Sequence, residues 1–393
     1  MKDLDVEGVT LRKGTEADAV CGVVPGRVAR PKDTKALGRL LTAARATGAT
    51  VTPRGGGTAL DWGSPPRSLD LMVDTSALSW IDHNAGDLVV EVGAGTPLAE
   101  LRRTLADAGQ RLSYDPLRVG GTVGGALATG VSGPRRLLAG GLRDLVIGMT
   151  LVRADGVVAR SGGRVVKNVA GYDLAKLHTG GYGTLGVIAS AAFRLHPLPP
   201  AVRVVSVPLR SREGTERALA DLRATTVVPA AVELDRDRLC VVLEGTAEGL
   251  VPRVEETLRA LGEEGAEVAE ELPEDWGLLP TEGTLARVLA PPAELPGLAC
   301  DLDADVRRYG SVPAGTLYLA FAPGTPADVV EKRLAAIRRV PDRTAVLLRA
   351  EPHVREAGVD SWGEVPGLSL MRAVKDSFDP DHRLSPGRFA GGI

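Results

Sequence analysis

Apolar and polar positions alternate along this chain in patterns that predict both helices and strands. An apolar stripe between Leu37 and Ala44 has the i, i+3, i+4, i+7 spacing of a helix with one buried face. We expect this helix to begin at Pro31 and to end at Gly48, a residue type common just after a helix C-terminus. Residues 49–53 then predict a short strand that runs into three consecutive glycines.

The alternation of strands and helices continues beyond these glycines. Further strands are predicted over residues 87–93, 145–154, 157–161 and 186–196, with Asp155-Gly156 as the turn between the second and the third. Thr96 is expected as the N-cap of a helix whose first residue is Pro97. Another helix is expected over residues 368–378.

A proline-rich stretch, Pro197-Leu198-Pro199-Pro200, marks the clearest boundary between domains. We therefore expect one domain over residues 1–200, a second over 201–350, and a C-terminal segment over 351–393. Within the second domain, the acidic run between Glu255 and Asp275 predicts a solvated helix face and loop.

Charge and cysteine content exclude several classes of protein. The net charge of -3 gives no reason to expect a nucleic-acid partner. Cys21, Cys240 and Cys300 are widely spaced, which argues against a disulfide framework or a cysteine metal site and favours a reducing compartment. No stretch approaches the roughly 18 uninterrupted apolar residues of a transmembrane segment, and residues 1–14 lack the apolar run of a signal peptide. We therefore expect a cytoplasmic protein.

Glycine is the unusual component, with 48 copies that cluster in the first half of the chain. Arg54-Gly55-Gly56-Gly57-Thr58 follows a predicted strand, and side-chain-free backbone there can bring successive N–H groups to an anion. Taken alone, this motif is equally typical of a flexible turn.

A second glycine-rich stretch runs from Pro116 through Gly120-Gly121-Thr122-Val123-Gly124-Gly125 to Ser132-Gly133. Such backbone can lie against a flat or anionic ligand, although close packing of a loop on a helix is the alternative. Arg143-Asp144 opens the strand that ends near residue 154, and a structural ion pair is an equally good interpretation of this pair.

A third stretch spans residues 162–174 and continues to Gly186-Val187-Ile188. It contains Gly181-x-Gly183-x-x-Gly186, which matches the dinucleotide-binding G-x-G-x-x-G pattern. That fingerprint requires a strand before it, a helix after it and an acidic residue about 20 positions further on. Here a strand follows and no Asp or Glu occurs between Asp173 and Glu213, so a Rossmann site is not expected.

In this order and spacing, the motifs resemble the PCMH-type FAD-binding domain of the vanillyl-alcohol-oxidase-like flavoproteins. The chain is particularly similar to the FAD-binding subunits of glycolate oxidases. The resemblance covers roughly residues 25–200. Two short C-terminal segments support it, Lys375-Asp376-Ser377-Phe378-Asp379-Pro380 and residues 383–389. It implies an α+β fold, in which two α+β subdomains hold FAD and a smaller α/β cap domain covers the flavin ring.

The resemblance also implies a set of cofactor-binding residues. Gly55, Gly56, Gly57 and Thr58 are expected to bind the pyrophosphate through backbone amides, and Gly186, Val187 and Ile188 to lie on the adenine side. The C-terminal segment is expected to return to the FAD domain and bring Arg388 toward the flavin. The remaining expected contacts are Arg54, Pro116, Gly120, Gly121, Thr122, Gly124, Gly125, Ser132, Gly133 and Arg143.

Relatives that attach FAD covalently use a histidine in the first glycine loop. This loop offers Thr58 instead, so noncovalent FAD is expected. Oxidation of a 2-hydroxy acid needs a base for the hydroxyl proton, a cation for the carboxylate and the flavin as hydride acceptor. No catalytic base stands out: His353 is a candidate from the second domain, although an exposed loop histidine is the simpler interpretation. Lys167 or Arg388 could supply positive charge near the flavin.

The leading hypothesis is an FAD-containing subunit of a glycolate-type 2-hydroxy-acid oxidoreductase. It would work with a second flavoprotein subunit and pass electrons to an iron–sulfur subunit, because the chain lacks the cysteine spacing for a cluster of its own. Attachment to the inner membrane through these partners is compatible with this hypothesis. Two alternatives remain open at this point: a self-sufficient FAD-dependent oxidase or dehydrogenase, and an assembly subunit without turnover.

Overall fold

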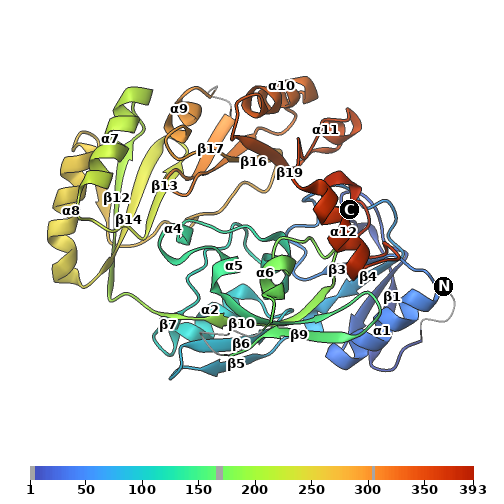
Figure 1. Cartoon of the computed structure of the whole chain (residues 1–393). Helices are drawn as coiled ribbons and strands as arrows, with labels where there is room; N and C mark the ends of the chain where they lie inside the picture. Colours follow the sequence, from blue (N-terminus) through green and yellow to red (C-terminus); the bar gives the residue numbers. More distant parts are fainter. Residues whose placement is uncertain (1–4, 165–170, 303–305) are drawn as a thin grey trace. The chain divides into compact units, whose positions relative to one another are not determined.

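The computed structural model describes residues 5–164, 171–302 and 306–393, and the chain divides into two compact units (Figure 1). Unit 1 comprises Met1–Val131, Gly141–Pro197 and Val365–Ile393, and unit 2 comprises Ser132–Gly140 and Leu198–Glu364. The boundary at Pro197 falls in the proline-rich stretch. Two parts of the division were not expected: residues 132–140 belong to unit 2, and the C-terminal segment of unit 1 begins at Val365 rather than at residue 351.

Unit 1 contains two main sheets. The first has the order β1-β2-β4-β3, in which β2, β4 and β3 are parallel and β1 is antiparallel to β2. Its strands are β1 (Val9–Lys13), β2 (Arg27–Pro31), β3 (Val51–Arg54) and β4 (Leu71–Asp74). The predicted strand over residues 49–53 corresponds to β3, the strand that leads into the first glycine loop.

Helix α1 (Thr34–Ala46) packs on the first sheet through its apolar stripe, which shares a core with Val51 and Leu71. The stripe was predicted correctly, but the predicted start at Pro31 is wrong. Pro31 ends β2, and the side chain of Asp33 is the N-cap, accepting a hydrogen bond from the Ala36 N–H at 2.7 Å.

The second sheet of unit 1 is antiparallel throughout, in the order β5-β6-β10-β8-β9. Its strands are β5 (Ile81–Asn84), β6 (Val89–Gly93), β8 (Val146–Val152), β9 (Val158–Gly162) and β10 (Val187–Arg194). Asp155-Gly156 lies between β8 and β9, as predicted. β10 follows the G-x-G-x-x-G stretch directly, which confirms that a strand rather than a helix comes after it.

The helices of this second half of unit 1 are short. They are α2 (Leu98–Ala106), α3 (Val123–Thr129), α5 (Leu142–Leu145) and α6 (Leu174–His178). Two short strands, β7 (Gln110–Arg111) and β11 (His196–Pro197), pair with each other outside the main sheets. Thr96 is not the N-cap of α2, because its hydroxyl is engaged with the backbone of Trp80. Pro97 occupies the cap position instead.

The C-terminal segment extends the first sheet. After α12 (Leu368–Phe378), which has the predicted bounds, Leu384 pairs in parallel with Val51 of β3. The Val51 N–H donates to the Arg383 carbonyl oxygen at 2.8 Å, and the Ser385 N–H donates to the Val51 carbonyl oxygen at 2.7 Å. Residues 383–385 therefore lie beside β3, the strand that leads into the first glycine loop.

Unit 2 is built on one antiparallel sheet of eight strands, in the order β15-β12-β14-β13-β17-β18-β16-β19. Apolar side chains from its helices and from the sheet form its larger core, and a smaller cluster is built from Val204, Ala230, Ala231 and Val242. The strands are β12 (Ala201–Pro208), β13 (Ala231–Asp235), β14 (Arg238–Gly245), β15 (Glu267–Ala269), β16 (Thr284–Leu289), β17 (Val306–Ser311), β18 (Thr316–Phe321) and β19 (Thr344–Arg349).

In its described residues, unit 2 has six helices. They are α4 (Arg136–Ala139), α7 (Arg212–Ala224), α8 (Ala247–Leu261), α9 (Leu295–Cys300), α10 (Ala327–Arg338) and α11 (Pro352–Glu356). The acidic run at 255–275 covers the end of α8, a loop and β15, and its acidic side chains are exposed as predicted except for the half-buried Glu256. Arg135 explains why residues 132–140 belong here, because it forms an ion pair with Glu244 of β14 at 3.0 Å.

Candidate functional site

The first glycine loop of unit 1 packs directly against the second. A Cβ atom at Gly55 would lie 2.1 Å from Thr122 Oγ1, and one at Gly56 would lie 2.1 Å from the Gly120 carbonyl oxygen. Any side chain at these two positions would force the loops apart. The structure therefore brings together two motifs that are about 65 residues apart in the sequence, and their contact requires glycine at these positions.

The second glycine loop is held in place by backbone hydrogen bonds. The Leu98 N–H donates to the Gly121 carbonyl oxygen at 3.0 Å, and the Gly124 N–H donates to the Ala94 carbonyl oxygen at 2.8 Å. Thr122 caps α3 by accepting a hydrogen bond from the Gly125 N–H at 3.3 Å. The loop is thus fixed on the segment between β6 and α2.

A cavity lies between the two loops, and we call it the loop cavity. It encloses about 810 Å³, open space at its mouth included. Its lining comprises residues 52–60, Trp62, Leu98, Tyr114, residues 116–118, Gly121, Gly125, Ala126, Ala128, Thr129, Val131, Tyr182 and Arg388. All of these residues belong to unit 1.

A second cavity, the strand cavity, adjoins the first and has a volume of about 480 Å³, open space at its mouth included. Its lining comprises Pro53, Arg54, Gly55, Thr75, Gly124, Gly125, Ala128, His178, Gly181, Gly183, Leu185, Gly186, Val187 and Ile188, again all in unit 1. The two cavities share Pro53, Arg54, Gly55, Gly125 and Ala128. Together they form an elongated space that passes the first glycine loop and reaches the start of β10.

Arg54 lines both cavities, but its guanidinium is already paired. It lies 2.6 Å from Asp18 and 3.0 Å from Asp74. The pKa of Asp18 is held far below its usual range, chiefly by its hydrogen bonds to Arg12. Its burial opposes this shift, and Thr15 and Arg54 lower the pKa further. The side chain of Arg54 thus anchors the end of β3, which leaves its backbone to contact a ligand.

Arg388 is a buried cation beside the loop cavity. Its guanidinium donates to the carbonyl oxygens of Trp62 at 2.5 Å and Leu60 at 3.4 Å. Within the described part of the chain, no carboxylate lies within ion-pair distance of it, and burial lowers its pKa. The cavity therefore carries positive charge that an anionic ligand could neutralise.

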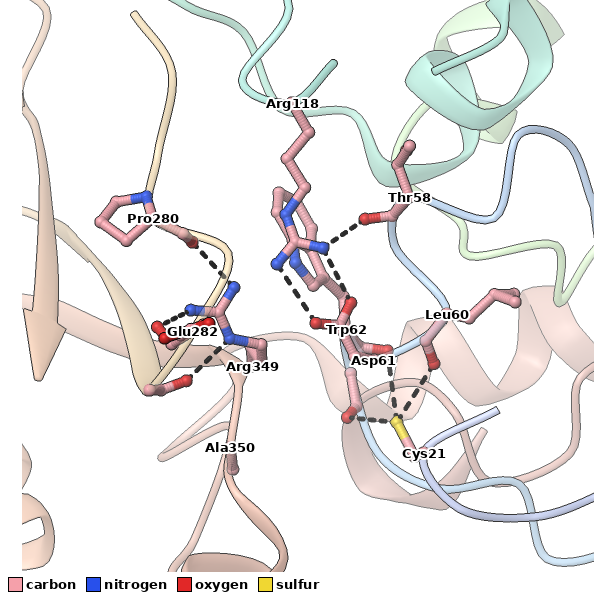
Figure 2. Close-up of polar contacts among 12 residues, drawn as sticks. Cys21, Thr58, Leu60, Asp61, Trp62, Arg118, Pro280, Glu282, Arg349 and Ala350 are labelled. Atoms are coloured by element: carbon pink, nitrogen blue, oxygen red, sulfur yellow. Dashed lines mark hydrogen bonds and ion pairs between the residues drawn. The ribbon is translucent and has the colours of Figure 1, made fainter. Parts of the chain in front are cut away.

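Arg118 connects the second glycine loop to the residues after the first (Figure 2). Its guanidinium forms two parallel contacts with the carboxylate of Asp61, at 3.1 and 3.2 Å. It also donates to the Thr58 carbonyl oxygen and lies 5.4 Å from the ring centroid of Trp62. Bidentate pairing and stacking of this kind fix a loop more firmly than a single surface ion pair does.

His178 is the residue of the strand cavity that sequence reasoning did not select. It ends α6, is buried, and packs edge-on against Phe378 of α12 with ring centroids 5.4 Å apart. Burial lowers its pKa to about 4, so the imidazole is neutral at physiological pH. Its Nε2 atom is buried and has no hydrogen-bond partner among the residues that the structure describes.

Most of the expected cofactor-binding residues line this elongated space. The loop cavity contains Arg54, Gly55, Gly56, Gly57, Thr58, Pro116, Gly121, Gly125 and Arg388, and the strand cavity adds Gly124, Gly186, Val187 and Ile188. Gly120 and Thr122 line neither cavity but lie directly behind Gly56 and Gly55.

The other candidates lie elsewhere. Arg143 is exposed on α5 and lines neither cavity, and Ser132 and Gly133 belong to unit 2. His353 is exposed on α11, where its Nε2 donates to the Thr325 carbonyl oxygen at 2.9 Å, as expected for a structural histidine. Lys167 lies outside the described residues.

Unit 2 has a buried arginine of its own. The guanidinium of Arg349 donates to the carbonyl oxygens of Pro280, Glu282 and Gly283 (Figure 2). These bonds fix the loop before β16, so this arginine has a clear structural role within its unit.

Comparison with known families identifies two matching domains. The FAD binding domain matches residues 25–162, and the C-terminal domain of FAD linked oxidases matches residues 359–389. The first match contains both packed glycine loops. The second contains Lys375, Asp379 and Arg388 of the segment that pairs with β3.

Curated proteins of similar sequence include two glycolate oxidase subunits and a D-lactate dehydrogenase. The chain is 25% identical to the glycolate oxidase subunit GlcD of Bacillus subtilis over 93% of this chain and 89% of that protein. It is 35% identical to the glycolate oxidase subunit GlcE of Escherichia coli over 55% of this chain and 63% of the relative. It is 31% identical to a D-lactate dehydrogenase of Archaeoglobus fulgidus over 54% of this chain, a match that spans 47% of that enzyme.

A solved structure has the same fold. Glucooligosaccharide oxidase of Acremonium strictum superposes with a TM-score of 0.68 over 96% of this chain and 95% of its own, at 15% identity. Fold, glycine loops and family matches define a flavoprotein of the FAD-linked oxidoreductase class. The chain contains matches to the FAD binding domain and to the C-terminal domain of FAD linked oxidases, which supports the PCMH-type FAD-binding family and FAD as the cofactor.

The cavities fit this cofactor in three respects. Close-packed backbone without side chains leaves amide groups free to approach a pyrophosphate. A buried arginine without a carboxylate partner suits a ligand that carries negative charge. The space also continues to the start of β10, as an elongated dinucleotide requires.

Among the described residues, no cluster of His, Cys, Asp and Glu could hold a metal ion, and no helix is long and apolar enough to cross a bilayer. Cys21, Cys240 and Cys300 all lie in the described part of the chain and form no disulfide there.

Proposed function

We propose that FAD lies along the two cavities of unit 1, bound noncovalently. The backbone of Gly55–Thr58 binds the pyrophosphate, and the adenine half points toward Gly186, Val187 and Ile188. This orientation is supported by the continuous lining and by the Cβ contacts that would close it at Gly55 and Gly56. Thr58 stands where a histidine would be needed for covalent attachment.

Arg388 supplies the charge of this site. The pyrophosphate brings negative charge into a space where Arg388 donates to the carbonyl oxygens of Leu60 and Trp62. Charge-assisted contacts are roughly twice as strong as neutral ones. The flavin supplies the acceptor for a hydride when it is bound. The chain positions that ring, excludes water from it and balances its charge.

The reaction that we propose is oxidation of a small 2-hydroxy acid of the glycolate type. Support comes from the named activities of the relatives, since glycolate and D-lactate are both 2-hydroxy acids. The chain spans less than two thirds of two of these relatives, so the shared chemistry is better supported than any single substrate.

We further propose that the chain works as one subunit of an assembly. The described lining of the loop cavity contains arginines and tyrosines but no histidine or carboxylate that could serve as the general base. Tyrosines are therefore the candidates for the base within this lining, and a partner subunit is the other source that we propose. Electrons pass onward to an iron–sulfur partner, because three widely spaced cysteines cannot hold a cluster.

Anaerobic reduction of the FAD-loaded chain tests this function. Glycolate and D-lactate are added first to the chain alone and then together with GlcD-type and iron–sulfur partner subunits, and flavin bleaching is followed by absorbance. Bleaching that depends on the partners supports the subunit role, and bleaching of the chain alone indicates a self-sufficient dehydrogenase. A flavin that stays oxidised in both mixtures contradicts the proposed reaction.

A further inference from the structure

The polar side chains of the strand cavity are few, and their hydrogen bonds can be followed one by one. Arg54 is paired with Asp18 and Asp74, and the Thr75 hydroxyl donates to the Arg54 carbonyl oxygen at 3.0 Å. His178 is the third polar side chain of the lining. Its Nε2 atom has no hydrogen-bond partner in the described part of the chain.

This unpaired nitrogen requires an explanation. Nε2 of His178 is buried and lacks a hydrogen-bond partner among the described residues, and the whole residue is 4% exposed. Leaving such a group unsatisfied costs about 1–3 kcal/mol. Most buried polar groups in folded proteins do find a partner, so a ligand or an ordered water is expected to complete this site.

The surroundings of the imidazole select the kind of ligand. Its neighbours in the lining are glycines and the apolar Leu185, Val187 and Ile188, while the single cation, Arg54, is neutralised by two carboxylates. Such a site disfavours a phosphate. It suits a flat, uncharged heteroaromatic ring that offers hydrogen-bond donors and acceptors.

The imidazole also lies against the start of β10. A Cβ atom on Gly186 would come within 3.4 Å of Cε1 of His178. Glycine at this position keeps the space beside the ring open. The imidazole is neutral, so it can donate or accept depending on its tautomer.

Building on the FAD site proposed above, we infer that His178 hydrogen-bonds to the adenine of FAD and contributes to selection of the dinucleotide over FMN. Adenine carries both an amino donor and ring-nitrogen acceptors, so either tautomer of His178 finds a complement. Phe378 supports the imidazole from α12, which makes the C-terminal segment an indirect part of adenine recognition.

Binding of FAD and FMN to the full chain freed of flavin tests this inference. Two variants are compared with the wild type: His178→Met, which keeps the volume but not the hydrogen bond, and His178→Gln, which keeps a donor and an acceptor. For His178→Met we expect the dissociation constant of FAD to rise about three- to tenfold and that of FMN to stay unchanged. His178→Gln should recover part of the loss.

A matched control is His83→Met, since His83 lies on β5 and lines neither cavity. It should bind FAD as the wild type does. Equal losses of FAD and FMN affinity in His178→Met would overturn the inference, because His178 would then support the fold rather than the adenine. Unchanged FAD affinity would also overturn it and would favour an ordered water at Nε2. If the wild-type chain bound no flavin, the proposed function itself would fail.

Discussion

Nζ of Lys375 lies 2.7 Å from Oδ2 of Asp379, and both side chains are almost completely buried. The same ammonium donates to the carbonyl oxygens of Thr184 and Leu384, each at 2.8 Å. Thr184 belongs to the loop that precedes β10, and Leu384 pairs with β3. One buried ion pair thus joins the C-terminal segment to both parts of unit 1 that line the strand cavity.

Replacing Lys375 with Met should strongly destabilise the protein. The substitution leaves the Asp379 carboxylate buried without its cation, and breaking a buried pair in this way typically costs about 3–5 kcal/mol. Chemical unfolding measures the change in free energy. A matched control is Lys332→Met, which removes an exposed pair with Asp328 of the same sequence separation. It should leave the free energy of unfolding unchanged, and equal effects in the two variants would contradict the account.

Gly56→Ala should reduce flavin binding. The added Cβ would meet the Gly120 carbonyl oxygen at 2.1 Å, so the two glycine loops must separate. Overpacking of this kind costs about 1–3 kcal/mol, and we expect the dissociation constant of FAD to rise about tenfold or more. Gly86→Ala is the control, because the nearest atom to its Cβ is 3.6 Å away. Wild-type affinity in Gly56→Ala would show that the loops do not bind the cofactor.

Arg388→Met should weaken FAD binding while Arg388→Lys retains part of it. The arginine is the buried positive charge of the loop cavity, and a hydrogen bond to a charged group contributes about 1.5–3 kcal/mol. Flavin fluorescence during titration gives the dissociation constants, for which we expect an increase of about ten- to a hundredfold in Arg388→Met. A methionine variant with higher affinity than the lysine variant would argue against an electrostatic role.

The buried His178 should make the flavin-free protein less stable in acid. Its pKa is about 4 in the folded chain and 6.5 in the unfolded one, so between these values only the unfolded state takes up the proton. The free energy of unfolding therefore has its full value above pH 6.5. It falls as the pH is lowered toward 4, by about 3 kcal/mol at most. Chemical unfolding of wild type and His178→Met across this range isolates the effect. Parallel pH profiles would show that His178 is not buried in the neutral form.

The sequence predicted the parts of the fold that depend on local pattern. The apolar stripe of α1, the bounds of α12 and the turn between β8 and β9 follow from periodicity and turn residues. The glycine loops were recognised by their order along the chain. Their contact through Gly56 and Gly120 is a property of the tertiary structure that no local pattern contains.

The features that the sequence did not reveal depend on burial. Lys375 and Asp379 look like surface residues of a polar helix, and a single histidine such as His178 is usually unremarkable in a sequence. The assignment of residues 132–140 to unit 2 rests on long-range contacts such as Arg135 with Glu244. The prediction of Thr96 as an N-cap is wrong because its hydroxyl bonds to the backbone of Trp80 instead. The sequence does not reveal that contact.

The absorption spectrum of the purified chain, recorded before and after acid precipitation, tests the central claim most directly. We predict a yellow protein whose colour passes entirely into the supernatant, where it is identified as FAD at one molecule per chain. Colour that remains with the pellet would contradict noncovalent binding at a loop that ends in Thr58. A colourless chain that takes up no added FAD would contradict the site itself.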